Sequence, residues 1–191
     1  MSKVTNVLVS GVGGQGTILA SDLISDTALA LGFDVKKNEV HGMAQRGGAV
    51  VTQVRYGEKV YSPLIPEGTG DYLLSFELVE AARYAGHLAP HAVILVNDMR
   101  ISSVTILARS EVYPNDPLGG IREAVKECVV IPASTEAAKL GNPRVANVIM
   151  LGAFAKRAGL EVEAFRDSIR RVVKPKFIEL NLKAFEIGFG Y

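Results

Sequence analysis

The chain has 191 residues, of which 48% are hydrophobic and 21% charged, and its formal net charge is +1. This composition is typical of one globular domain, and the near-neutral charge gives no indication of nucleic-acid binding. The longest apolar stretches, residues 92–96 and 148–155, are too short to span a bilayer, and residues 1–6 lack the pattern of a signal peptide. We therefore expect a single cytoplasmic domain over residues 1–191.

The sequence contains one cysteine, Cys128. A single thiol cannot form an internal disulfide, and it cannot supply the four thiolates that hold an iron–sulfur cluster. Cys128 begins the apolar run 128–131, so we expect it to pack as a small hydrophobic side chain in a strand. A reducing compartment suits this cysteine content.

The first part of the chain predicts a strand, a glycine-rich turn, a helix and a second strand. Residues 4–10 are almost continuously apolar, as in strands covered on both faces. Residues 17–31 carry apolar side chains at helical spacing, and Gly32 follows them as a helix-ending residue. Residues 34–39 are suited to form the second strand.

The middle of the chain interrupts this alternation. Residues 40–48 have no periodicity and predict a loop, whereas residues 49–56 alternate in the manner of a strand. We expect that strand to turn at 57–59 and to return at 60–62 as a β-hairpin.

Further strands are expected at 71–76, 92–97 and 128–131, with a helix at 77–85 and another at 121–127. A short helix at 134–140 could begin with Ser134 as its N-cap and end before Gly141. The remaining segments, 145–158, 162–172 and 175–187, predict helices. The fold class is therefore α/β: a Rossmann-like open, mostly parallel sheet with helices on both faces, a β-hairpin insertion and a helical C-terminal segment.

The glycine turn is the first candidate site. Gly11, Gly13 and Gly16 match the pattern G-x-G-x-x-G between the first strand and the first helix. The first glycine allows the tight turn, the second lets the backbone approach an anion, and the third allows close packing. The amides of the first helical turn are then available to a phosphate or carboxylate. A tight turn that binds nothing is the alternative. The candidate cofactor-binding residues are Gly11, Gly13, Gly14, Gln15, Gly16 and Thr17.

The loop that follows is the second candidate site. It carries His41, Gln45, Arg46 and Gly47 beside further glycines. A guanidinium can pair with two oxygens of a carboxylate or phosphate, and an imidazole can transfer protons near neutral pH. The alternative is structural: Arg46 in an internal ion pair and His41 bonded to the loop backbone.

Two other functions are compatible with the glycine turn. Glu39 lies about where the ribose-binding acid of a dinucleotide fold is expected, so a free-standing NAD(P)-dependent oxidoreductase is one possibility. A non-enzymatic nucleotide-sensing or scaffold module is the other.

The motifs together resemble a known family. GVGGQG at 11–16 and EVHGMAQRGGAVVTQVRYG at 39–57 are similar to the gamma-type domain of the 2-oxoacid:ferredoxin oxidoreductases, and most similar to the small subunits of the indolepyruvate type. YSPLIP at 61–66, and GDYLL at 70–74 followed by Glu77, resemble the segment after the hairpin in that family. Residues 141–142, Asn147 and 150–153 resemble its C-terminal motif.

The resemblance implies a subunit of a heteromeric complex that oxidatively decarboxylates an aryl 2-oxoacid, such as indolepyruvate, to its acyl-CoA and passes electrons to ferredoxin. Thiamine diphosphate supplies the carbanion chemistry in such enzymes. The resemblance implies that a larger alpha subunit holds thiamine diphosphate, magnesium and the iron–sulfur clusters, and that CoA is a co-substrate. It predicts no catalytic residue, no metal site and no activity for this chain alone. The glycine turn would face a CoA phosphate or the partner, and the loop would face the active site or the subunit interface.

The C-terminal helices are rich in cations. We expect a solvated helical face, with docking to an acidic partner or to CoA phosphates as the alternative. The cations are Lys156, Arg157, Arg166, Arg170, Arg171, Lys174 and Lys176.

Overall fold

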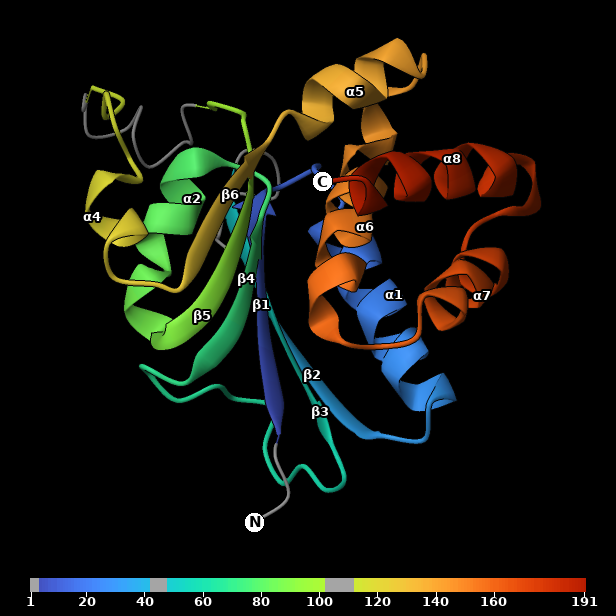
Figure 1. The fold of residues 1–191 in the computed structure, drawn as a ribbon, viewed down its shortest axis with the longest axis horizontal. Helices are drawn as coiled ribbons and strands as arrows, with labels where there is room; N and C mark the ends of the chain where they lie inside the picture. The colour runs from blue at the N-terminus through green and yellow to red at the C-terminus, as the bar shows by residue number, and fades with distance from the viewer. Residues whose placement is uncertain (1–3, 42–47, 102–111) are drawn as a thin grey trace.

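A computed structural model describes residues 4–41, 48–101 and 112–191. They form a six-stranded sheet in the order β2-β3-β1-β4-β5-β6, with helices on both faces (Figure 1). The predicted α/β architecture is confirmed. The strands are β1 (Thr5–Val12), β2 (Asp34–His41), β3 (Ala49–Gly57), β4 (Gly70–Ser75), β5 (Leu88–Asn97) and β6 (Glu127–Ile131).

The sheet is parallel from β1 to β6 and antiparallel at its other side. β1 pairs with β4, β4 with β5 and β5 with β6, all in parallel, while β3 is antiparallel to both β1 and β2. Val7, Leu8 and Val9 in the centre of β1 are fully buried. Val7 and Val9 join one hydrophobic cluster and Leu8 joins the other, so both faces of β1 are covered. This explains the continuous apolar run.

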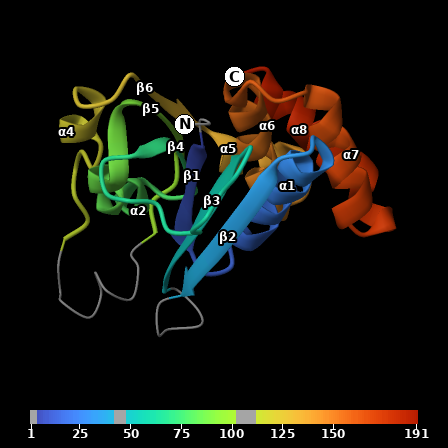
Figure 2. The same ribbon diagram turned by 90° about the horizontal axis from the view of Figure 1, so that it is seen from below.

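The helices divide between the two faces (Figures 1 and 2). One face carries the long helices, and the opposite face carries two short ones, while α5 follows β6. Among the described residues, short 3-10 turns lie at Ala85–His87, between α2 and β5, at Pro143–Val145, before α6, and at Pro175–Phe177, before α8. The first face has α1 (Thr17–Ala30), α6 (Ala146–Ala158), α7 (Val162–Val172) and α8 (Ile178–Phe189); the other has α2 (Leu78–Arg83) and α4 (Gly119–Arg122); α5 is Ala133–Lys139. No helix among the described residues is both long enough and apolar enough to cross a membrane.

α6 and α8 cross in close contact at two glycines. A Cβ at Gly152 would lie 2.1 Å from the carbonyl oxygen of Phe185, and a Cβ at Gly188 would lie 1.8 Å from that of Ile149. Neither position has room for a side chain, since a backbone oxygen cannot move aside without shifting its helix. α6 is therefore fixed between the sheet and α8.

The β-hairpin differs from the predicted one. β2 and β3 pair with each other, from Asp34 opposite Gly57 to His41 opposite Val50, whereas residues 60–62 are not a strand. Instead, the Val60 N–H donates to the side chain of Asp34, the first residue of β2, at Oδ2. The prediction was wrong because it paired the strand at 49–56 with residues 60–62, whereas the partner of that strand is β2, which precedes it in the chain.

Two smaller expectations also need correction. Ser134 does not cap α5, because Pro132 occupies the N-cap position and the Ser134 hydroxyl bonds elsewhere. Cys128 packs against the cluster beneath α2, as expected of a small hydrophobe, but it is only half-buried. Burial raises the pKa of its thiol, and the nearby Arg122 opposes that rise.

Candidate functional site

A cavity of about 240 Å³ lies where the parallel strands reach their carboxyl ends. α1 leaves β1 toward one face of the sheet, and α2 leaves β4 toward the other. The crevice between two such strands is the usual ligand position in open α/β sheets. The lining residues lie at or just beyond the ends of β1, β4, β5 and β6, or at the start of α6: Gly14, Gln15, Phe76, Asn97, Met99, Ser134, Pro143, Arg144 and Ala146.

Much of the glycine turn is engaged by the chain itself. The Gly13 N–H donates to the carbonyl of Gly48 at 2.9 Å. Gln15 folds back over the turn: its Oε1 accepts from the Val12 N–H at 2.7 Å, and its Nε2 donates to the carbonyl of Phe76 at 2.9 Å. A Cβ at Gly11 would lie 2.8 Å from Gln15 Oε1, so the first glycine makes room for this fold-back.

Gly16 is covered by a side chain from α6. It is the N-cap of α1, with a φ of 84° that favours glycine. Asn147 Nδ2 donates to the Gly16 carbonyl at 3.2 Å and would lie 2.3 Å from a Cβ at Gly16. The third glycine, Gly16, therefore allows α6 to pack closely against the glycine turn. Asn147 is 3% exposed, and its Oδ1 has no hydrogen-bond partner in the described part of the chain.

The open part of the turn is small. Of the six residues predicted to bind a cofactor, Gly14 and Gln15 line the cavity. Gly11, Gly13 and Gly16 make the internal contacts given above, and Thr17 is buried at 4% exposure. The Gln15 N–H donates to the Val12 carbonyl at 3.1 Å, so Gly14 is the part of the turn whose backbone lies open at the cavity. The N-terminus of α1 has no side-chain cap, but its first-turn residues do not line this cavity.

A polar network forms the wall of the cavity opposite the turn. Asn97 Nδ2 donates to Ser134 Oγ at 2.8 Å, and Asn97 Oδ1 accepts from the Ser134 N–H at 3.1 Å. The Ser134 hydroxyl donates in turn to the sulfur of Met99 at 3.2 Å. This network ties the end of β5 to the start of α5 and holds the wall rigid.

A buried carboxylate supports the same wall from beneath. Glu77 is 1% exposed, and it accepts the N–H of Glu80 at 2.9 Å, the N–H of Ile101 at 3.1 Å and the hydroxyl of Tyr113. It thus caps α2 and fixes the chain just beyond Met99. Burial raises the pKa of Glu80, an effect that the ion pair with Arg83 opposes.

Arg144 is the cation of this cavity. It lies in the 3-10 turn Pro143–Val145, where Asn142 Oδ1 accepts its N–H at 3.1 Å. Its side chain is exposed, and among the described residues no carboxylate pairs with it. Sequence reasoning missed Arg144, Asn97 and Met99. A signal existed for two of them, since Asn97 ends an apolar strand and Arg144 follows a Gly-Asn-Pro helix break.

The predicted loop site is described only at its edges. Gln45, Arg46 and Gly47 lie outside the described residues. His41 ends β2 with its backbone paired opposite Val50. The Gly48 carbonyl accepts from the Gly13 N–H, so the chain leaving the loop touches the glycine turn. The two candidate segments therefore meet in space where the loop returns to the sheet.

Glu39 occupies the wrong place for a ribose-binding acid. β3 lies between β1 and β2, so Glu39 on β2 is one strand removed from the strand that carries the glycine turn. The Glu39 Oε1 atom forms a salt bridge with Nζ of Lys37 at 2.6 Å. The dinucleotide fold needs this acid on the strand next to the turn.

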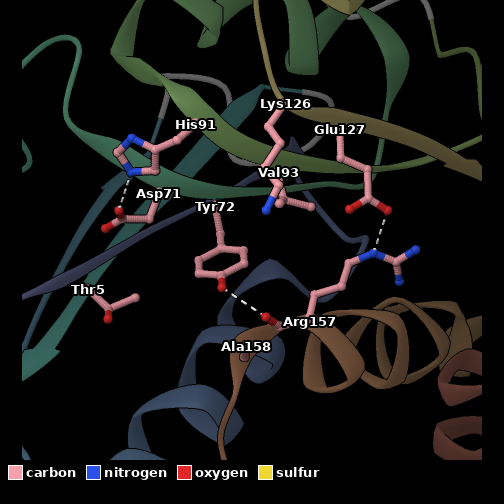
Figure 3. A pocket seen from close by; sticks show the side chains of 9 residues that line it. All are labelled: Thr5, Asp71, Tyr72, His91, Val93, Lys126, Glu127, Arg157 and Ala158. Atoms are coloured by element: carbon pink, nitrogen blue, oxygen red, sulfur yellow. Dashed lines mark hydrogen bonds and ion pairs between the residues drawn. The ribbon is translucent and has the colours of Figure 1, made fainter.

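A larger cavity, of about 470 Å³, lies at the opposite, amino ends of the strands (Figure 3). Most of its charged groups are paired with each other, and the exposed Lys126 has no carboxylate partner among the described residues. His91 Nε2 bonds to Asp71 Oδ1 at 2.8 Å, Arg157 Nε donates to Glu127 Oε1 at 2.9 Å, and the Tyr72 hydroxyl donates to the Arg157 carbonyl at 2.9 Å. The lining is Thr5, Asp71, Tyr72, His91, Val93, Lys126, Glu127, Arg157 and Ala158.

The described residues do not fit an iron–sulfur cluster or a metal ion. Cys128 faces an apolar cluster, and no group of three or more His, Cys, Asp or Glu in the described part of the chain is arranged to hold a metal. We therefore derive no chemical step through such a group in this chain.

A family model for pyruvate ferredoxin/flavodoxin oxidoreductase matches residues 6–191. The chain is 38% identical to indolepyruvate oxidoreductase subunit IorB of Thermococcus kodakarensis, over 97% of this chain and 95% of that protein. A solved gamma subunit of a keto/oxoacid ferredoxin oxidoreductase from Geobacter sulfurreducens superposes with a TM-score of 0.72 at 25% identity, covering 97% of this chain and 96% of that one.

A second solved structure shares the fold inside a longer chain. It is the 2-oxoglutarate:ferredoxin oxidoreductase of Magnetococcus marinus, with a TM-score of 0.79 at 20% identity. The match covers 100% of this chain and 31% of that one. The fold therefore occurs both as a separate chain and as one part of a larger polypeptide.

Proposed function

This chain belongs to the pyruvate ferredoxin/flavodoxin oxidoreductase family, and we propose that it is the small subunit of an enzyme that oxidatively decarboxylates aryl 2-oxoacids, such as indolepyruvate, to acyl-CoA with reduction of ferredoxin. The observation that carries this proposal is the match to an indolepyruvate oxidoreductase subunit over nearly the whole length of both proteins. The choice of indolepyruvate as the substrate rests on that name.

The proposal requires a larger partner subunit. The single cysteine of the chain cannot supply the ligands of an iron–sulfur cluster. Thiamine diphosphate, magnesium and the clusters are therefore assigned to the larger subunit, where thiamine diphosphate would supply the carbanion chemistry. This chain contributes a preformed wall to the active site of the complex.

The cavity beside the glycine turn is the part of this chain that we expect to contact a substrate. Gly14 offers a backbone donor, and Arg144 offers a guanidinium at the other side. Together they suit an anionic group, either a CoA phosphate or the carboxylate of a 2-oxoacid. The chain would bind and orient this group and exclude water around it.

The free-standing NAD(P)-dependent function is disfavoured. It needs Glu39 next to the strand that carries the glycine turn, and β3 separates them. A nucleotide-sensing or scaffold module remains distinguishable by its partner, since it would have no dedicated thiamine-dependent subunit.

The test is reconstitution with the partner. We expect the tagged chain to co-purify from its native source with a larger iron–sulfur protein. We expect indolepyruvate-dependent, CoA-dependent reduction of ferredoxin by the complex and none by the chain alone. Full turnover by the isolated chain, or a native partner without thiamine diphosphate, would refute the proposal, and tight NADH binding would restore the dehydrogenase alternative.

A further inference from the structure

A second, apolar opening continues from the cavity beside the glycine turn. It is a groove of about 310 Å³ between α1, the end of α7 and the start of α8. Arg144 lines both the groove and the cavity. The groove is lined by Leu19, Asn142, Arg144, Val145, Val172, Val173, Lys174, Phe177 and Asn181.

Large apolar side chains are left exposed in this groove. Val172 is 38% exposed and Phe177 is 39% exposed, whereas Val145 beneath them is 3% exposed. Phe177 directly precedes α8 and leaves its ring accessible beside the groove. A contiguous apolar surface with a polar rim is typical of an interaction site.

The cations of the C-terminal region divide into two sets. Arg166, Arg170 and Arg171 each pair with carboxylates of the same chain, at 2.6 to 3.1 Å. By contrast, within the described ranges no carboxylate pairs with Lys174 or with Arg144, which line the groove. Lys176 lies over the Phe177 ring, 4.9 Å from its centre. The first set is neutralised by ion pairs within the chain, and the groove cations differ from it in having no such pairs among the described residues.

We propose that this groove docks a segment of the larger subunit in which apolar side chains are flanked by carboxylates. The inference rests on the proposed function. The apolar floor favours apolar side chains in a partner, and the cations at its rim, which have no carboxylate partner among the described residues, favour acidic ones. A solved relative carries this fold within a chain of which it covers only 31%, which supports a larger polypeptide as the occupant. Because Arg144 is shared, a segment docked in the groove would also close the rim of the substrate cavity.

The experiment is co-expression of the larger subunit with tagged variants of this chain. Lys174→Glu reverses a groove cation, and Phe177→Ser removes the exposed ring. Lys183→Glu is the matched control: it makes the same charge reversal at an exposed lysine of α8 that does not line the groove. We expect both groove variants to weaken subunit binding by about tenfold or more, and the control to leave it unchanged. Circular dichroism of each purified variant would verify folding.

Several outcomes would overturn the docking proposal. The proposal is wrong if both folded groove variants bind the larger subunit with wild-type affinity. It is also wrong if Lys183→Glu weakens subunit binding as much as the groove variants do. A normal complex in which the groove variants raise only the KM for CoA would show that the groove binds the co-substrate. A wild-type chain that recovers no larger subunit at all would instead refute the proposed function, so the two failures are distinguishable.

Discussion

The two ends of the sheet carry cavities that differ in what their polar groups contact. The cavity at the amino ends is the larger, about 470 Å³ against about 240 Å³. Its Asp71, Glu127 and Arg157 are bonded to groups of the same chain. At the carboxyl ends, Arg144 has no carboxylate partner among the described residues, and the N-terminus of α1 has no side-chain cap.

The proposed site is therefore distinguished from the larger cavity by its uncapped helix end and by a guanidinium that no described carboxylate pairs with, and not by its volume. α6 connects the two ends, since its first residue, Ala146, lines the smaller cavity and its last residue, Ala158, lines the larger one. Groups paired within the chain hold α6 against the sheet. Groups left without such partners are available for a substrate or another subunit, and each end can be tested separately.

The largest effect is expected at Gly16. Alanine there must adopt a left-handed backbone and displace Asn147, so Gly16→Ala should cost about 2–4 kcal/mol of stability. Gly14→Ala is the matched control, because Gly14 has a φ of 100° with nothing near its missing Cβ, and strain alone should cost about 1–2 kcal/mol. Urea unfolding measures both. Equal losses would show that α6 does not depend on this contact.

At the carboxyl ends of the strands, Arg144→Ala should weaken substrate binding without lowering the stability of the fold. In the assembled complex we expect the KM for the anionic substrate to rise about tenfold, because the variant removes a charge-assisted contact of roughly 1.4 kcal/mol. The unfolding midpoint should not change, since no carboxylate among the described residues pairs with Arg144. The control is Arg170→Ala, which removes an exposed arginine of α7 that forms ion pairs within the chain. Unaltered kinetics in an intact complex would remove Arg144 from the site.

At the amino ends of the strands, Arg157→Ala should lower stability without affecting turnover, and its free-energy change should be the smallest of the three. Arg157 bonds to Glu127 and to the carbonyls of Ala153 and Tyr191, and its side chain is 15% exposed. We expect a loss of about 1 kcal/mol in urea unfolding, from the ion pair and the packed side-chain stem. Turnover of the complex should stay at the wild-type level. A selective loss of turnover at unchanged stability would make the larger cavity a functional site.

Much of the fold could be predicted from the sequence because the signals are local. The apolar run of β1, the glycine turn, α1 and the C-terminal helices all follow from hydrophobic spacing and helix-ending glycines. α7 spans residues 162–172, as expected. Local signals do not specify which strands pair, and for that reason the hairpin partner of β3 was predicted wrongly.

The amino-acid sequence by itself determined that the chain makes a strand–glycine turn–helix unit within an α/β domain, since backbone conformation and hydrophobic periodicity are properties of neighbouring residues. Only the tertiary structure decided which residues surround that turn. Asn147 covers Gly16, and Arg144 and Asn97 face the open part from segments 80 or more residues away. Contacts between distant segments depend on how the layers pack, and that packing closed most of the glycine turn and left one side of it accessible.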